Sequence, residues 1–239
     1  VSLSISQWTG TAREKNGAET IERDAGAAKG TVSARKKVLP GCAELEAIQK
    51  HNNAFRLWFY QQTLPWDDNG GRILPAPNAE PFMRGVADWK DKGMKLVSAF
   101  VAVYPDMYQK SQLSLGTLWE QRAYPDPGVI VSKFGYRFHA EPIGDINDLR
   151  NFEGFKPEEV DERVQEAEQA IQERLAAAQK DLWTRLFDGV NAMAEKLAVP
   201  IGAQGSIFRD SLVNNLTELA DLLPKMNVVQ DPNIDRMVD

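Results

Sequence analysis

Residues 157–199 read PEEVDERVQEAEQAIQERLAAAQKDLWTRLFDGVNAMAEKLAV, and this stretch decides the fold class. It opens with a proline and two glutamates, which favour the N-terminus of a helix, and Pro200 stops the pattern at its other end. Between these limits apolar side chains recur at steps of three or four residues, the period of one helix face. We therefore predict one uninterrupted helix, roughly 60 Å long at 1.5 Å per residue.

The two halves of this predicted helix differ in composition. The first half is rich in Glu, Gln, Arg and Ala around a narrow apolar seam, whereas the second half adds Trp183 and Phe187. We expect the first half to project and to pair with another helix in an oligomer, and the second half to join the core. The residues predicted at the helix–helix interface are Val160, Val164, Ala167, Ile171 and Leu175.

The remaining elements follow from proline positions and hydrophobic spacing. Further helices are predicted at 41–63, 79–104, 105–119 and 208–223, with another starting at Asp231-Pro232. Pro105 is expected to end one helix and to open the next. Residues 136–141 alternate like a half-buried strand, which we expect to pair with Ile73-Leu74. The predicted fold is mainly α: a helical body, one long and partly projecting helix at about 157–199, and a small β-hairpin or ribbon.

Charge is distributed unevenly along the chain. The net charge is −6, yet residues 1–39 carry seven basic and four acidic side chains, so this segment is +3 and the rest is −9. We divide the chain into a basic, Gly/Ala-rich N-terminal arm (1–39), an aromatic-rich helical body with the small β element (40–156), and the long helix with a C-terminal helical segment packed on the body (157–239). Such an arm favours contact with phosphates, although its composition is also typical of poorly ordered termini.

Composition excludes several classes of protein. The chain is 43% hydrophobic and 26% charged, as globular proteins are, and no apolar run is long enough for a membrane helix. One cysteine and two histidines exclude a disulfide framework and a Cys/His zinc site. The first residues lack the pattern of a secretion signal, so a cytoplasmic protein is expected.

Catalytic motifs are absent from the sequence. There is no GxxxxGK[ST], GxGxxG, GxSxG or HExxH pattern. Three alternatives stay open: His139 as a general base, Cys42 as a nucleophile, and Asp67-Asp68 with Glu120 as ligands of a divalent cation. The same residues also fit structural roles as a surface histidine, a buried cysteine and turn formers. We expect a protein that is not an enzyme and that holds no metal or cofactor.

The candidate nucleic-acid surface combines cations with aromatic rings. Flat rings stack on unpaired bases, and cations bind phosphates. Consecutive helical positions point about 100° apart, so the aromatic run at residues 55–60 cannot bury every ring on one face. Tyr60, at a helix end, and Trp66, on a turn, are the rings we expect outside the core, which takes most of the others. The residues predicted to bind nucleic acid are Lys29, Arg35, Lys36, Lys37, Arg56, Tyr60, Trp66, Arg72 and Lys90.

Three motifs carry a resemblance to a known family. They are Ile5-Ser6-Gln7-Trp8, Thr63-Leu64-Pro65-Trp66 with the Gly-Gly that follows, and Ile207-Phe208-Arg209-Asp210-Ser211-Leu212. In this order they resemble an uncharacterised protein family of bacteriophages and mobile elements, helical and encoded near replication and recombination genes. The resemblance implies a setting in nucleic-acid metabolism, in the cytoplasm of a bacterial host. It implies no functional residue.

Two functions from different classes follow. The first is a non-enzymatic, phage-encoded DNA-binding protein of a replication or recombination module, which binds single-stranded DNA and self-assembles through the long helix. The second is an oligomeric scaffold or adaptor that binds a phage or host protein without nucleic acid. The first function requires the cations of the arm to share a face with exposed rings, and the second does not. Sequence periodicity does not show whether they share one.

Overall fold

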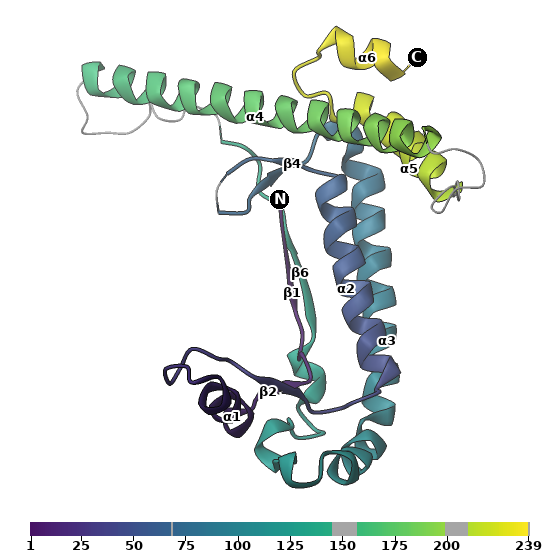
Figure 1. Cartoon of the computed structure of the whole chain (residues 1–239). Coiled ribbons are helices and arrows are strands. Elements are labelled where there is room, and N and C mark those ends of the chain that lie inside the picture. Colours follow the sequence, from purple (N-terminus) through teal and green to yellow (C-terminus); the bar gives the residue numbers. More distant parts are fainter. Residues whose placement is uncertain (68, 145–156, 199–209, 239) are drawn as a thin grey trace. The chain divides into compact units, whose positions relative to one another are not determined.

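The computed structural model describes residues 1–67, 69–144, 157–198 and 210–238 of the chain (Figure 1). As predicted, the fold is mainly α. The α-helices are α1 (Lys15–Ala25), α2 (Ala43–Gln61), α3 (Ala79–Leu115), α4 (Pro157–Leu197), α5 (Asp210–Met226) and α6 (Pro232–Val238). Short 3₁₀ helices are η1 (Ala76–Asn78), η2 (Gly116–Leu118), η3 (Gln121–Ala123) and η4 (Ile130–Lys133).

The β structure consists of short strand pairs. These are β1 (Ser2–Ser6) with β6 (Gly135–His139), β2 (Thr11–Arg13) with β3 (Arg35–Lys37), and β4 (Leu64–Pro65) with β5 (Arg72–Ile73). The predicted pairing of the strand near residue 136 with Ile73-Leu74 is therefore wrong. Ile73 pairs instead with Leu64 across the intervening turn, because closing a short loop costs less chain entropy than bringing together distant segments.

The chain divides into two compact units, each assembled from separated segments. Unit 1 consists of Val1–Ser2, Leu57–Gly85 and Phe138–Asp239, and unit 2 consists of Leu3–Arg56 and Val86–Arg137. This division does not follow the three consecutive segments that we predicted. Hydrophobic burial joins residues by their position in space, whatever their order along the chain.

The core of unit 2 lies where α2 and α3 run side by side (Figure 1). The predicted apolar series supplies it, with Ile48, Phe100 and Tyr104 fully buried. The Tyr124 hydroxyl in this core donates to the carbonyl of Val38 at 2.7 Å. Since Val38 is itself fully buried, the last residues of the predicted N-terminal arm belong to the core.

Helix α3 continues through Pro105, so the predicted helix boundary at this residue is wrong. Proline removes the amide that would donate to the carbonyl of Val101, at a cost of about 3 kcal/mol. Packing on both sides offsets this cost, because Tyr104 is fully buried and Met107 and Tyr108 contact the same core. Tertiary burial here overrides the local rule.

Gly93 in α3 gives a neighbouring ring room to approach. A Cβ atom at this position would lie 2.4 Å from the hydroxyl oxygen of Tyr136 in β6. That hydroxyl donates to the side-chain oxygen of Asn52 at 2.7 Å, and the Asn52 amide donates to the Gln7 side chain at 2.6 Å. The glycine therefore lowers helix propensity but permits a buried polar network between α3, β6 and α2.

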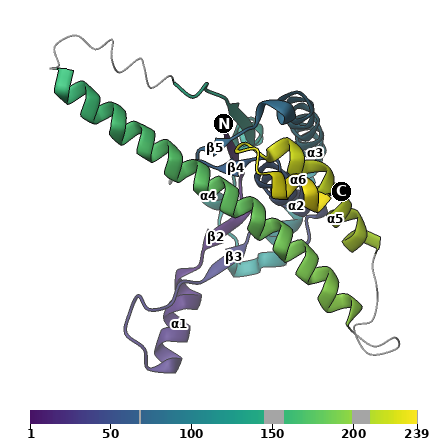
Figure 2. The same ribbon diagram turned by 90° about the horizontal axis from the view of Figure 1, so that it is seen from above.

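The core of unit 1 is built by α4, α5 and α6 with β4, and Figure 2 shows α5 and α6 beside α4. Ala178, Leu182 and Leu186 of α4 are buried together with Leu223 and Met226 of α5. Helix α5 ends at Met226, two residues after Pro224 and close to the predicted end near that proline. The predicted first residues of this helix, 208–209, lie outside the described residues.

Helix α4 is confirmed as one long helix. The prediction that its whole second half joins the core is wrong, because Phe187, Val190 and Leu197 are 70%, 47% and 64% exposed. At about 100° per residue Phe187 points about 140° away from Leu182, whereas Val190 and Leu197 follow Leu186, the last residue of α4 in this core. Among the described residues, the part of α4 that is buried in the core with α5 thus ends at Leu186.

Candidate nucleic-acid interface

The basic residues around position 36 lie on a two-stranded antiparallel ribbon. Strands β2 and β3 pair in the register Thr11↔Lys37, Ala12↔Lys36 and Arg13↔Arg35. Successive side chains of a strand point to opposite faces, so the middle pair faces one way and the two outer pairs face the other. Lys36 is buried, whereas Arg35 and Lys37 are exposed. The run Arg35-Lys36-Lys37 is therefore divided between an inner and an outer face.

Lys36 anchors the inner face within unit 2. Its ammonium lies 2.9 Å from Glu14 and 2.8 Å from Glu120, and it donates to the carbonyl of Leu118 at 2.6 Å. Burial lowers the pKa of Lys36, but the bonds to Glu120 and Glu14 outweigh burial and raise the pKa above its ordinary value. The same bonds lower the pKa of both carboxyl groups. All three donors of this ammonium are used inside the unit, so Lys36 is not presented to a phosphate.

The outer face carries cations without carboxylates, and we name its residues Thr11, Arg13, Arg35 and Lys37 the ribbon face. Arg13 and Arg35 are directly opposite each other, a pairing of like charges that destabilises a sheet. Arg35 donates to the Thr11 hydroxyl at 3.0 Å, which orients the guanidinium and leaves its charge uncompensated. Within the described part of the chain, no carboxylate forms an ion pair with these three cations.

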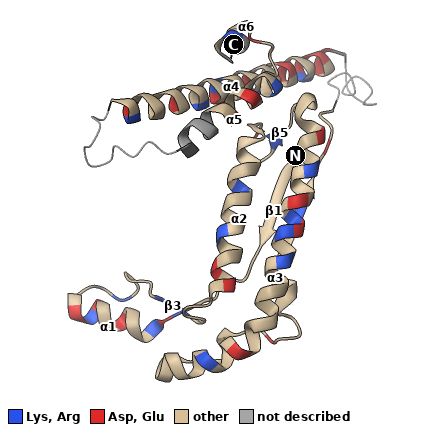
Figure 3. Ribbon diagram, turned by 90° about the vertical axis from the view of Figure 1, so that its right-hand side faces the viewer, with Lys and Arg blue, Asp and Glu red and all other residues tan. Residues whose placement is uncertain are grey.

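A buried carboxylate shapes the chain between β2 and β3. Glu22 of α1 is 5% exposed and accepts hydrogen bonds from the amides of Gly30 at 2.7 Å and Val32 at 2.9 Å. The Val32 and Gly30 amides lower the pKa of Glu22. Figure 3 shows basic residues on β3 and both charge signs along α1. The predicted arm thus contains a helix and a strand pair.

Three other predicted contacts of unit 2 lie outside the ribbon face. Lys29 is exposed in the loop after α1, 3.5 Å from Glu19. Arg56 donates to the carbonyl of Ile5 at 3.3 Å, and Lys90 is half-buried on α3. The ribbon face therefore brings together two of the predicted residues, Arg35 and Lys37. It adds Arg13, which sequence reasoning missed because only the strand register places it opposite Arg35.

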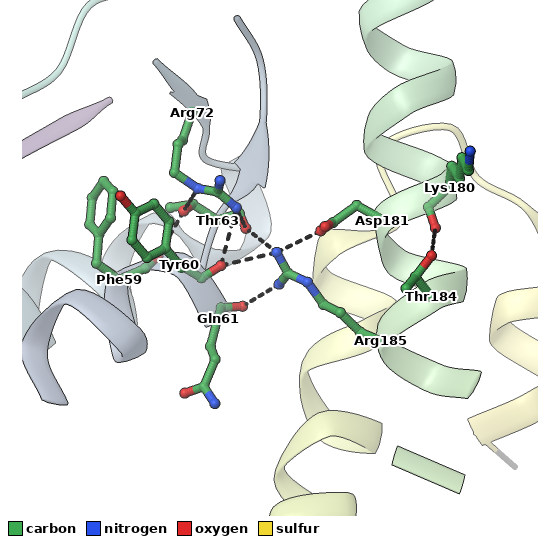
Figure 4. A network of polar contacts seen from close by, with 9 residues as sticks. All are labelled: Phe59, Tyr60, Gln61, Thr63, Arg72, Lys180, Asp181, Thr184 and Arg185. Carbon is green, nitrogen blue, oxygen red and sulfur yellow. Dashed lines mark hydrogen bonds and ion pairs between the residues drawn. The ribbon is translucent and has the colours of Figure 1, made fainter. Parts of the chain in front are cut away.

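The predicted residues Tyr60, Trp66 and Arg72 belong to unit 1. Tyr60 is 50% exposed, and the Arg72 guanidinium lies 4.8 Å from its ring centroid. Arg72 also donates to the hydroxyl and carbonyl oxygens of Thr63 at 2.7 and 2.8 Å (Figure 4). Trp66 is half-buried with Arg174 over its ring at 5.4 Å. The two predicted rings are thus held by arginines of their own unit.

Most other rings are core residues, as predicted. Trp89 stacks on Phe55 with ring centroids 5.5 Å apart, and Trp58 stacks on Phe82 at 5.3 Å. Trp8 meets Tyr104 edge-on at 5.9 Å. In the described part of unit 2, the exposed large apolar side chains include no aromatic residue. The described part of unit 2 therefore presents exposed cations but no exposed aromatic ring.

The seam residues predicted to form a helix–helix interface are partly covered within unit 1. Val164 is buried, and Val160, Ala167, Ile171 and Leu175 are half-buried. Ala167 and Ile171 line a hollow of unit 1 together with strand β5. These two positions are therefore used within one chain, and self-assembly through the seam stays a prediction.

The three catalytic or metal-binding alternatives are placed as follows. His139 is exposed with its ring nitrogen 2.6 Å from Glu141. Cys42 is 1% exposed, and burial raises the pKa of its thiol. Asp67 accepts from the amides of Asn69 and Gly71, both at 2.8 Å, as turn formers do.

One of the proposed cation ligands, Glu120, has basic partners. Glu120 is bound by Lys36 and by Arg122, and it belongs to a different unit from Asp67. Asp68 lies outside the described residues. Among the residues that the structure describes, no group of three or more His, Cys, Asp or Glu side chains is placed to hold a metal ion.

Comparison of the chain with protein-family models gives no match, and comparisons with curated proteins and with solved structures give none either. The resemblance to a phage family therefore stays a prediction. No helix in the described ranges combines the length and the apolar character that crossing a bilayer requires.

Proposed function

We propose that this protein binds nucleic acid through the phosphodiester backbone, with the ribbon face as the contact surface. The observation that carries the proposal is the pairing of Arg13 with Arg35, which places two basic residues at directly opposed positions of the ribbon, while no described carboxylate forms an ion pair with either. An anion that bridges them turns a repulsive pair into two charge-assisted hydrogen bonds. Phosphate is the anion that guanidinium forks fit best, together with carboxylate.

The anchoring of the ribbon supports this function. Lys36 ties the inner face to Glu14, Glu120 and the Leu118 carbonyl, so the strands that carry the outer cations are fixed before a ligand arrives. Preorganised groups lose less conformational entropy on binding. The contact needs no base-specific readout, because phosphates position a ligand without carrying sequence information.

Single-stranded DNA is the ligand that we propose first, bound without chemical conversion. The acidic net charge of −6 does not oppose this function, because affinity follows the local cations and the counterions that they release from the strand. Each phosphate neutralised on a single strand contributes about 0.7 to the slope of log affinity against log salt. The three cations of the ribbon face thus account for a slope of about 2 by the same rule.

The test is a titration of a labelled single-stranded oligonucleotide, followed by fluorescence anisotropy at several salt concentrations, with a duplex as a second probe. The variant replaces Arg13, Arg35 and Lys37 by Gln. A matched control replaces three exposed lysines of unit 2, Lys50, Lys110 and Lys133, by Gln, and so removes the same charge. We expect the ribbon variant to lose at least about tenfold in affinity and about 2 from the salt slope, and the control to lose much less.

Two outcomes would contradict the proposal. Equal losses in the ribbon variant and in the control would assign the binding to overall charge instead of the ribbon face. Absence of binding by the folded wild-type protein at low salt would remove nucleic acid as the ligand. Tighter binding of the duplex than of the single strand would keep the surface and change the preferred form of DNA.

A second function, attachment to a protein partner through α4, has one specific observation in its favour. Phe187, Val190 and Leu197 are exposed at helical spacing, and rows of exposed apolar side chains mark interaction surfaces. Light scattering of the wild type and of Phe187→Ser tests it. A wild-type mass of one chain, unchanged in the variant, would contradict self-assembly through this stripe.

A further inference from the structure

Unit 1 contains a hollow of 860 Å³ that the proposed function does not use. The turn between β4 and β5, residues 139–144 and helix α4 line it. Its apolar surface includes Ile73, Ala170 and Ile171, and its polar groups include Trp66, His139 and Arg174. Its volume lies in the range of small-molecule sites, and Asp67, Arg72 and Glu141 add further charged groups to its wall.

The wall of this hollow contains a cation–π pair from two distant parts of the chain. The Arg174 guanidinium of α4 lies 5.4 Å from the ring centroid of Trp66, on the β4–β5 turn. A second hollow of 460 Å³ is lined by the same two side chains. The pair therefore borders open space in both hollows, and a flat ligand has room beside it.

The polar groups around the pair differ in whether they have hydrogen-bond or ion-pair partners within the unit. The Asp67 carboxylate accepts from the amides of its own turn, and His139 pairs with Glu141 at 2.6 Å. Arg72 donates to Thr63. Arg174 differs, because no carboxylate among the described residues forms an ion pair with it.

Arg174 lies over the Trp66 ring without an ion pair to any described carboxylate. A guanidinium that stacks on an indole keeps its N–H groups in the plane of the stack, where they can bind an anion bidentately. Its outer face, like that of the indole, is a platform for a flat ring. An anionic group and an aromatic ring are therefore recognised at one place.

We propose that this hollow binds a nucleotide, with the phosphate on the edge of Arg174 and the base against the Trp66–Arg174 pair. Trp66 acts as the positioning residue of Arg174, and the apolar wall with Ile73 and Ile171 excludes water from the base. The site lies in unit 1, separate in sequence from the ribbon face of unit 2. Its ligand is either a free nucleotide or an unpaired nucleotide of a strand.

The experiment is isothermal titration of the full chain with dAMP, deoxyadenosine, inorganic phosphate and a short oligo(dA). We expect dAMP to bind, with deoxyadenosine and phosphate each weaker by about tenfold or more, since each lacks one of the two contacts. Arg174→Gln is expected to weaken dAMP to the level of deoxyadenosine. Arg163→Gln, on the same helix but ion-paired with Glu166 at 3.0 Å, is the matched control and is expected to leave dAMP binding unchanged.

The positioning role of Trp66 has its own readout. Trp66→Leu is expected to weaken dAMP as strongly as Arg174→Gln, whereas Trp66→Phe, which retains a ring, is expected to restore most of the affinity. Circular dichroism and the melting temperature of each variant show whether the chain is folded. Equal binding by Trp66→Leu and the wild type would overturn the positioning role.

The probes also separate the two sources of the nucleotide. If dAMP binds as tightly as oligo(dA), the ligand is a free nucleotide, and if only oligo(dA) responds to Arg174→Gln, it is part of a strand. The proposal is overturned if dAMP does not bind and Arg174→Gln leaves oligo(dA) unchanged, or if dAMP binds equally to wild type and Arg174→Gln. The ribbon variant should bind dAMP as the wild type does, so failure of one proposal leaves the other testable.

Discussion

Arg72 of β5 and Arg185 of α4 both donate to the carbonyl oxygen of Thr63, at 2.8 and 2.9 Å (Figure 4). Arg185 also donates to the carbonyls of Tyr60 and Gln61 at 3.0 and 2.9 Å. These carbonyls lie at the C-terminal end of α2, which has no basic residue in its last turn. Two guanidinium groups from later in the chain thus donate to the free carbonyls at the C-terminal end of α2, where positive charge also interacts favourably with the helix dipole.

We expect Arg72→Met and Arg185→Met together to lower the free energy of unfolding by more than the sum of the two single losses. Each single variant should lose about 1.5–3 kcal/mol, the contribution of charge-assisted hydrogen bonds. Besides burial, the charge of Arg185 lowers the pKa of Arg72, so each single variant also relieves repulsion. The double variant relieves that repulsion only once and leaves the Thr63 carbonyl without either donor.

A double-mutant cycle by urea unfolding measures this coupling. The double loss should exceed the sum of the single losses by about 0.5 kcal/mol or more. Arg84→Met, which breaks an exposed ion pair with Glu80, serves as the control and should change stability by less than about 1 kcal/mol. Strict additivity would contradict a shared acceptor.

Gly93→Ala should destabilise the protein although alanine is the better helix former. At an open helical position the change would gain up to about 1 kcal/mol. Here the new Cβ would meet the Tyr136 hydroxyl at 2.4 Å and disturb its bond to Asn52, so we expect a net loss of about 1–3 kcal/mol. Gly144→Ala, which meets no atom within 4 Å, is the control. A melting temperature raised by Gly93→Ala would contradict the contact.

Stability should fall in acid partly through Glu22. Its pKa is lowered from 4.5 by the Val32 and Gly30 amides, so its contribution is present above pH 4.5 and is lost as pH falls through the lower, folded-state pKa. Glu22→Gln should lower the melting temperature at neutral pH. Below pH 4.5 the melting temperature of this variant should depend less on pH than that of the wild type. Glu46→Gln, at an exposed position, should keep the wild-type profile. Identical profiles for Glu22→Gln and wild type would rule out this carboxylate as the cause.

Lys36→Met distinguishes an anchor from a phosphate contact. The ammonium is buried between Glu14 and Glu120, so its loss should loosen the ribbon and weaken nucleic-acid binding without changing the salt slope. A direct phosphate contact would instead lower the slope by about 0.7 on a single strand. Hydrogen exchange of the β3 amides, faster in the variant, should accompany the weaker binding. If hydrogen exchange of the β3 amides were unchanged and the salt slope were reduced, Lys36 would be a phosphate contact after all.

Sequence patterns predicted elements better than they predicted partners. The α4 helix followed from the spacing of Val164, Leu182 and Leu186, since a period of three to four residues belongs to helices alone. The boundary at Pro105 failed because burial of Tyr104 and Tyr108 against the core offsets a lost hydrogen bond. The strand at residues 136–141 was predicted, but its partner was not, because periodicity says which face is apolar and not which strand lies alongside.

The candidate surface shows the same division. Counting charges located the basic segment, but Lys36 was assigned to a phosphate although it binds Glu120, a residue distant in the sequence. Arg13 and Arg174 carried no signal of their own among the other arginines. Their roles depend on the register with Arg35 and on the ring of Trp66.

The sequence by itself determined the helical class, the length of α4 and the concentration of positive charge before residue 40, because these depend on local periodicity and composition. The buried cation, the rings packed in the cores and the two arginines that meet at Thr63 become visible only in the folded chain. Such pairings are set by long-range burial and by the need to satisfy buried polar groups. Neither is encoded in the spacing of neighbouring residues.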